Sequence, residues 1–205
     1  QDIQTLQRIR GRCIGNRTAL VNETRGLLWE YGSAGPQGIG QLRRALPVIL
    51  EDSKNELTAA FGSLLGELQE ELGEMDQKLL RYDTRIKELS KHKEACQRLE
   101  KIPGVGPLTS TAIVGAVGNP QAYRNGREFS AWLGLVPRQH STGGKDRLGG
   151  ISKRGDKYLR TMLVHGARAE LRVCAKKTDP QSLWIQRLVE RRGKFKAMVA
   201  LANKN

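Results

Sequence analysis

The stretch "LTAAFGSLLGELQEELGEMDQKLLRYDTRIKEL", residues 57–89, decides the fold class. Large apolar side chains recur along it at steps of four and three residues, the spacing that lines up one stripe of a coiled-coil helix. The rhythm slips once, at Leu72, where two steps of four follow each other. The spacing predicts one long helix over 53–91. Its seam is formed by Leu57, Phe61, Leu64, Leu68, Leu72, Met75, Leu79, Tyr82, Ile86 and Leu89.

This seam suits two partners. Either the helix packs against another helix of its own chain, or it pairs with a second copy and makes the protein a homo-oligomer. Charged residues fill the other faces in both cases, so the sequence leaves both open. Apolar spacing also favours helices over 2–31 and 41–50, with a Gly- and Pro-rich turn at 31–40 between them.

The chain divides into two predicted regions of a mainly α protein: a helical, coiled-coil region at 1–96 and a compact basic helical domain at 97–205. Residues 138–205 hold 17 Lys and Arg against 5 Asp and Glu, a net charge of +12. Residues 1–137 hold 18 against 16, a net charge of +2. This asymmetry points to a polyanion partner. Nucleic acid is favoured over a membrane, because no stretch is long and apolar enough for a membrane helix.

Three cysteines and three histidines are too scattered to suggest a metal site or a disulfide framework. Cys13, Cys96 and Cys174 include no CxxC pair, and the histidines lack metal-ligand spacing. We therefore expect no metal ion or other cofactor bound by this chain, and free thiols in a reducing cytosol.

The motif "KIPGVGPLTSTAIVGAVG", residues 101–118, has the form of a helix-hairpin-helix. One proline breaks an apolar segment, glycines make a tight turn, and a second proline opens a new helix. Backbone N–H groups at such a turn favour a phosphate group. We therefore expect DNA or RNA phosphates at Gly104, Val105 and Gly106. The alternative is a plain turn between two core helices.

The next motif, "YRNGREFSAWLGLVPRQ" at 123–139, supplies predicted core residues. Phe129, Leu133 and Leu135 are expected to be buried. Trp132 is expected in the core as well, with stacking on a nucleic-acid base as the alternative.

The stretch "HSTGGKDRLGGISKRGDKYLR", residues 140–160, contains two glycine turns, each followed by basic residues. Such loops present N–H groups and cations to phosphates. A helix with a basic face is expected from 156 to 174. The predicted phosphate-, DNA- and RNA-binding cations are Arg138, Lys145, Arg147, Lys153, Arg154, Lys157 and Arg160.

Ser141 is the candidate nucleophile of this stretch. A serine needs an activating group to attack a phosphodiester, and no Ser-His-Asp arrangement can be assigned here. Nearby cations would stabilise a pentavalent phosphate. Taken alone, the residues favour a turn serine that bonds locally. Ser152 is a poorer candidate, expected to cap a helix or to touch phosphate.

Four ordered phrases of the chain change this balance: "IPGVGPLTSTAIVGAVG", "FSAWLGLVPRQHSTGGK", "GGISKRGDKYLRTMLVHGAR" and "VALANKN". Together they closely resemble the IS110 family of insertion-sequence transposases, and within it the IS1111 branch. The resemblance is dense over 97–205 and extends over most of the chain. It implies a site-specific DNA recombinase of a bacterial insertion element, acting in the cytoplasm at the nucleoid.

The resemblance also implies roles and partners. The catalytic serine of the family follows an "LGLVPR"-like phrase, which places it at Ser141. It would attack a DNA phosphodiester, and a structured bridge RNA from the element would guide a dimer or tetramer. Four acidic residues of an N-terminal RuvC-like domain would bind Mg²⁺.

The sequence departs from the family in one respect. It contains no recognisable RuvC-like domain or acidic quartet, so we expect only the coiled-coil and transposase portions here, inactive on their own. The sequence therefore predicts part of a transposase with Ser141 as its nucleophile. The alternative is a non-catalytic module that binds the DNA or RNA backbone within a larger assembly.

Overall fold

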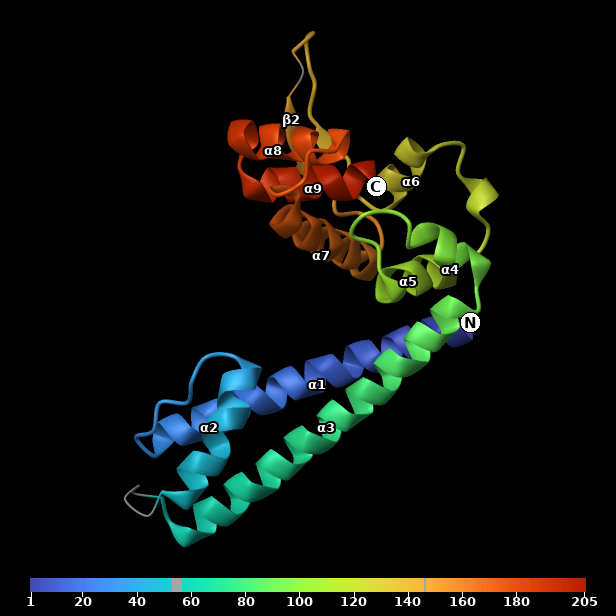
Figure 1. Ribbon diagram of the computed structural model, residues 1–205. Coiled ribbons are helices and arrows are strands. Elements are labelled where there is room, and N and C mark those ends of the chain that lie inside the picture. Colours follow the sequence, from blue (N-terminus) through green and yellow to red (C-terminus); the bar gives the residue numbers. More distant parts are fainter. Residues whose placement is uncertain (53–56, 146) are drawn as a thin grey trace. The chain divides into compact units, whose positions relative to one another are not determined.

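The computed structural model describes residues 1–52, 57–145 and 147–205 and is mainly helical, as the sequence predicts (Figure 1). The chain separates into two compact units. One comprises Thr5–Arg85, and the other comprises Ile86–Asn205 together with Gln1–Gln4. The domain boundary predicted after residue 96 stays a prediction. Among the described residues, no helix is both long enough and apolar enough to span a membrane.

Ion pairs align the helices of the first unit. These helices are α1 (Asp2–Glu30), α2 (Ile39–Glu51) and α3 (Ala59–Lys91). Arg10 bonds Asp83, and Arg17 Nη1 bonds Asp76 Oδ1 at 3.0 Å. The two pairs lie seven residues apart on both helices, in opposite directions, so α1 and α3 are antiparallel in one heptad register. Arg43 of α2 also contacts Asp76, which joins all three helices.

The seam of α3 differs from the predicted one at one position. Leu65 is fully buried and Leu64 is 55% exposed, whereas the sequence spacing placed Leu64 in the seam. With Leu65 in its place, the seam alternates strictly between steps of four and three from Phe61 to Leu89, so the predicted stutter at Leu72 is wrong. The start of the predicted helix, residues 53–56, lies outside the described residues.

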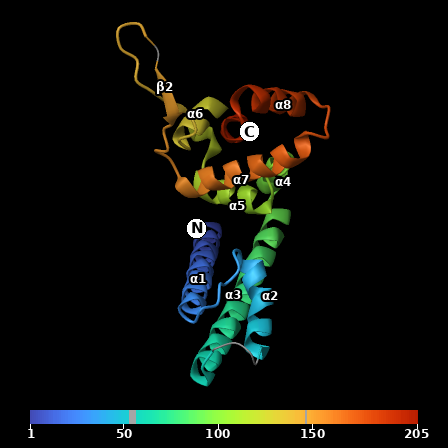
Figure 2. The ribbon, with the colours of Figure 1, turned by 90° about the vertical axis from the view of Figure 1, so that its left-hand side faces the viewer.

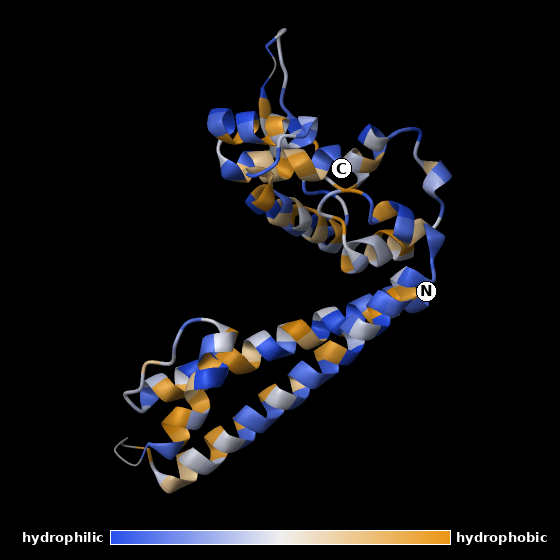
Figure 3. Cartoon of the chain, viewed as in Figure 1, coloured by the Kyte–Doolittle hydropathy of each residue, from blue (hydrophilic) through white to orange (hydrophobic). Residues whose placement is uncertain are grey.

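Much of this seam is buried within the chain. Phe61, Leu65 and Leu72 belong to one apolar cluster with residues of α1 and α2, namely Leu20, Val21, Leu28, Leu42 and Leu46. In Figure 3, hydrophobic residues alternate with hydrophilic ones along each of these helices. The seam thus packs against helices of its own chain, the first of the two partners considered. Pairing with a second copy stays a prediction.

The second unit is organised around α7 (Lys157–Cys174), which packs against α5, α8 and α9. Its core includes Leu133, Leu159, Leu163, Ile185 and Leu201. The remaining elements are α4 (Glu94–Leu99), α5 (Pro107–Val117), the 3-10 helix η1 (Pro120–Ala122), α6 (Gly126–Trp132), β1 (Pro137–Gln139), β2 (Leu148–Ile151), α8 (Pro180–Arg192) and α9 (Lys194–Lys204).

Side-chain caps start several helices of this unit, including α6, α7 and α8. Asp156 Oδ1 accepts a hydrogen bond from the backbone N–H of Leu159 and begins α7, so the cap is Asp156 and not Ser152. Asp179 begins α8 in the same way. The hydrogen bonds from Ser182 hold the pKa of Asp179 below its ordinary value.

Backbone meets backbone where the "PGVG" turn crosses α7. A Cβ at Gly104 would lie 2.6 Å from the carbonyl oxygen of Gly166, and a Cβ at Gly166 would lie 1.9 Å from the carbonyl oxygen of Gly104. Gly104 also has a φ of +84°, which side chains rarely adopt. Both positions therefore require glycine.

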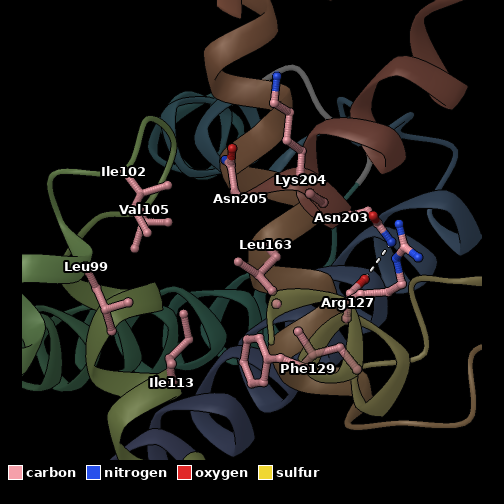
Figure 4. Close-up of a pocket in the computed structure, with 14 residues that line it drawn as sticks. Leu99, Ile102, Val105, Ile113, Arg127, Phe129, Leu163, Asn203, Lys204 and Asn205 are labelled. Atoms are coloured by element: carbon pink, nitrogen blue, oxygen red, sulfur yellow. Dashed lines mark hydrogen bonds between the residues drawn. The ribbon is translucent and has the colours of Figure 1, made fainter. Parts of the chain in front are cut away.

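The C-terminal residues are bonded into this unit beside a pocket of about 320 Å³ (Figure 4). Residues from α4, α5, α6 and α7 line the pocket. Asn203 Nδ2 donates to Ser130 Oγ at 2.5 Å, and Asn205 Nδ2 donates to the carbonyl oxygen of Pro103 at 2.8 Å. The "ANKN" phrase thereby holds α6 and the "PGVG" turn in place.

The assigned seam makes one prediction. Leu65→Ala should lower the free energy of unfolding by about 2–5 kcal/mol, because it leaves a cavity among three helices. Leu64→Ala removes an exposed neighbour and should change it by less than about 0.5 kcal/mol. Urea unfolding followed by circular dichroism measures both variants, and equal losses would contradict the seam.

The close contact between Gly104 and Gly166 gives a second prediction. Gly166→Ala should destabilise the protein by about 1–3 kcal/mol, because the new Cβ meets the Gly104 carbonyl. Gly73→Ala in α3 is the matched control, since a Cβ there meets nothing within 4 Å. It should stabilise the protein by about 0.5–1 kcal/mol through helix propensity. Calorimetry compares the two, and an unchanged transition for Gly166→Ala would show that the approach is not tight.

Candidate functional site

The stretch around Ser141 folds into a β-hairpin. Strands β1 and β2 run antiparallel, with Pro137 opposite Ile151. Beyond the strands, His140 donates its backbone N–H to the carbonyl oxygen of Arg147 at 2.9 Å. Figures 1 and 2 both show this hairpin projecting from the helices of its unit. The sequence predicted glycine turns here but no strands.

The hairpin reverses direction at "TGGK". The backbone N–H of Lys145 donates to the carbonyl oxygen of Thr142 at 3.2 Å. Between them, Gly143 and Gly144 have φ values of +58° and +74°. Two successive residues with positive φ make the tight turn that joins antiparallel strands, and glycine adopts it without strain. The backbone conformation of the turn therefore explains why glycine stands at both positions.

Ser141 lies on this hairpin arm, two residues before the first turn glycine, and is exposed. Its Oγ accepts a hydrogen bond from Nε2 of Gln139 at 2.9 Å. Residues two apart in extended backbone share a face, which is why these side chains meet. Gln139 was not identified from the sequence, although its spacing from Ser141 is the signal that could have found it.

Cations gather along the arm and its base, all of them exposed: Arg138, Lys145, Arg147, Lys153 and Arg154. Arg138 and Arg154 line a shallow hollow of about 250 Å³ together with His140 and Ser152. Guanidinium groups, a hydroxyl and an imidazole around a hollow are groups that suit a phosphate. The predicted cations of this arm are therefore grouped in space as well as in sequence.

Glycines fix the base of the hairpin. A Cβ at Gly155 would lie 1.8 Å from the carbonyl oxygen of Trp132, and a Cβ at Gly134 would lie 2.7 Å from the backbone nitrogen of Arg154. The two chain segments that enter and leave the hairpin therefore touch through their backbones. This contact gives the exposed arm a rigid base.

Arg160 has a structural role that the sequence did not predict. Its Nη1 donates to the carbonyl oxygens of Leu133, at 2.9 Å, and Gly155, at 3.2 Å. The side chain is half-buried and ties the hairpin base to α7, whereas the helical spacing suggested a nucleic-acid contact. Lys157, three residues earlier, is exposed on the first turn of α7.

The "PGVG" turn, residues 103–106, contacts α7 at a different place from the hairpin arm. Val105 is buried in the core, and its N–H already donates to the carbonyl oxygen of Ile102 at 3.0 Å. Gly106 stands at the N-cap of α5. This turn touches Gly166, whereas the hairpin base touches Trp132 through Gly155. Gly155 and Gly166 are eleven residues apart, a separation of about 16 Å for helical backbone. The turn and the hairpin arm thus occupy separate places along α7.

Aromatic rings lie next to the hairpin base. Trp132 is 38% exposed, and its ring centroid lies 5.6 Å from that of Tyr123 and 5.8 Å from that of Phe129. Leu133 and Leu135 are buried as predicted, but Trp132 is not a fully buried core residue. Its exposed indole leaves base stacking open.

Within the described part of the chain, no three His, Cys, Asp or Glu side chains come together as a metal-binding group. The Mg²⁺ ion that the family resemblance implies, held by acidic residues outside this chain, stays a prediction.

Comparison with known proteins agrees with the sequence phrases. Residues 96–181 match the family model described as "Transposase IS116/IS110/IS902 family". The whole chain is 46% identical to a "Probable family 20 transposase" of Pseudomonas aeruginosa and 48% identical to the "Transposase for insertion sequence element IS1111A" of Coxiella burnetii. It is 33% identical to the "Transposase for insertion sequence element IS1328" of Yersinia enterocolitica.

The chain spans only part of these relatives, 61%, 56% and 60% of their respective lengths. The match to each nevertheless runs through all of the chain, including the hairpin arm and the "PGVG" turn. On these grounds residues 96–181 match the IS116/IS110/IS902 transposase family, and the chain as a whole is similar to transposases of insertion elements.

Proposed function

We propose that this chain is the part of an insertion-element transposase that cleaves and rejoins DNA, with Ser141 as the nucleophile. The position of Ser141 on an exposed arm that also carries Arg138, Lys145 and Arg147 is the observation that carries the proposal. A phosphodiester laid along the arm would meet the hydroxyl and the cations together.

In the proposed step, Ser141 Oγ forms a bond to phosphorus while the bond from phosphorus to one deoxyribose oxygen breaks. The serine hydroxyl releases its proton, and the departing oxygen takes one up. The new phosphodiester between Ser141 and the DNA is similar in free energy to the broken one. A strand hydroxyl can therefore attack the same phosphorus and release the serine. The three arm cations would stabilise the charge on the five-coordinate phosphate.

The remaining partners belong to the same proposal. Lys153, Arg154 and Lys157 would bind the DNA backbone or a guide RNA, and Mg²⁺ would be held by acidic residues outside this chain. The protein would act in the bacterial cytoplasm, at the nucleoid. A second copy would dock on α3 away from the filled seam, where Leu64 is exposed.

A non-catalytic module is the second candidate. The hydrogen bond from Gln139 to Ser141 favours it, because the bond gives the serine a local structural role. In that case the arm would hold a nucleic-acid backbone without reacting with it.

Ser141→Ala separates the two candidates. In a protein that joins this chain to a family acidic domain, with Mg²⁺, guide RNA and labelled DNA, a denaturing gel reports the covalent adduct. We expect the adduct to disappear while DNA affinity changes by about 1 kcal/mol or less, the value of one hydrogen bond. Ser63→Ala, an exposed change on α3, is the control and should keep the adduct. An adduct that persists in Ser141→Ala would place the nucleophile elsewhere.

Arginine variants separate binding from folding. Arg138→Gln should weaken duplex-DNA binding and reduce the slope of log K against log salt by roughly 0.9, the value for one lost phosphate contact. Arg160→Gln should instead lower stability by about 1–3 kcal/mol, because two partly buried carbonyls lose their donor. Lys87→Gln, an exposed change on α3, is the control for both measurements. If Arg160→Gln alone reduced the salt slope, the assigned roles would be reversed.

A further inference from the structure

A second basic surface lies away from the hairpin arm. A groove of about 710 Å³ runs between α7, α8 and the start of α9. Leu171, Val189 and Met198 supply apolar lining, and Arg168 and Arg172 line it from α7. Beside them, Phe195 is 81% exposed, the highest exposure among the large hydrophobic residues reported for the described chain.

The sequence at the α8–α9 junction is "RRGKFK", residues 191–196, with four cations and one aromatic ring in six positions. Lys194 and Lys196 lie in the first turn of α9, which contains no acidic residue. The N-terminal end of a helix carries partial positive charge, so cations there are unfavourable for the isolated helix. An anion bound at this turn would relieve that repulsion.

Nearby acidic groups do not cancel this charge. Glu170 is engaged by Lys177 at 2.7 Å, and Glu190 is the one acid that lines the groove. Arg168, Arg172 and Lys194 take part in none of the ion pairs recorded among the described residues. These cations therefore remain to balance a ligand's negative charge.

The groove is held in shape by hydrogen bonds between two of the helices that line it, α8 and α7. Gln186 Nε2 donates to the carbonyl oxygen of Cys174 at 2.6 Å and to that of Lys177 at 3.0 Å. These bonds tie α8 to the C-terminal end of α7. A ligand would thus enter a preformed groove, which lowers the entropic cost of binding.

We propose that this groove binds an unpaired nucleotide of single-stranded DNA. The base stacks on Phe195 over the apolar lining, and Arg168, Arg172 and Lys194 hold the flanking phosphates. An aromatic platform beside cations is how proteins bind single strands without reading their sequence. The proposal rests on the proposed function only in taking DNA as the partner, because strand cleavage during transposition frees unpaired nucleotides.

Fluorescence anisotropy of the 205-residue chain with a labelled single-stranded DNA oligonucleotide tests this. Phe195→Ala should weaken binding about tenfold or more. Phe195→Trp should retain binding and Phe195→Leu should not, because stacking requires a ring and not only an apolar surface. Trp29→Ala removes another exposed aromatic residue and should bind as the wild type does. Arg168→Gln with Arg172→Gln should reduce the single-strand salt slope by roughly 1.4.

Three results would overturn the inference. Unchanged affinity in Phe195→Ala would remove the stacking site, and full affinity in Phe195→Leu would indicate an apolar protein partner instead. A loss confined to an RNA oligonucleotide of the same sequence would assign the groove to RNA. Arg138→Gln measured in parallel keeps the two proposals apart: if it weakens binding while Phe195→Ala does not, the groove fails and the hairpin proposal stands. If the chain binds no DNA at all, both fail.

Discussion

The second unit depends on two places where backbone touches backbone without side chains between. At one, Gly104 meets Gly166 in the middle of α7. At the other, Gly155 meets the carbonyl oxygen of Trp132 just before α7 begins. Any Cβ would separate these segments. One helix therefore positions both the "PGVG" turn and the base of the hairpin arm, and a shift of that helix would move both together.

This arrangement gives the arm a rigid base and an exposed tip. Arg160 and the base glycines fix where the arm starts, while Ser141 and the cations around it face water. A serine in water is a poor nucleophile. Water also screens the attraction between the cations of the arm and a phosphate. Chemistry at Ser141 would thus need DNA or another domain to cover the arm and exclude water. If DNA or another domain completes the site, Ser141 should be exposed in this chain alone.

The helices could be predicted from the sequence, whereas the hairpin could not. Heptad spacing predicted α3 because 33 residues carry the signal, but two adjacent leucines fit the rule equally and only packing selects Leu65. Strands of three and four residues are too short to show alternation, so "STGGK" suggested a phosphate loop and not a hairpin tip. Arg160 was assigned to a nucleic-acid face because helical spacing does not reveal which carbonyls a long side chain can reach.

The distribution of ion pairs explains why the net charge is informative about function. Five of the six ion pairs recorded in the described chain lie within residues 1–137, where acids and bases nearly balance, and three of these join α1 or α2 to α3. Residues 138–205 hold 17 of the 35 Lys and Arg, yet one recorded ion pair, Lys177 with Glu170. Charge that folding does not neutralise repels itself and costs stability. The cations left in this state on the arm and around the groove would be balanced by the polyanion that we propose binds at both places.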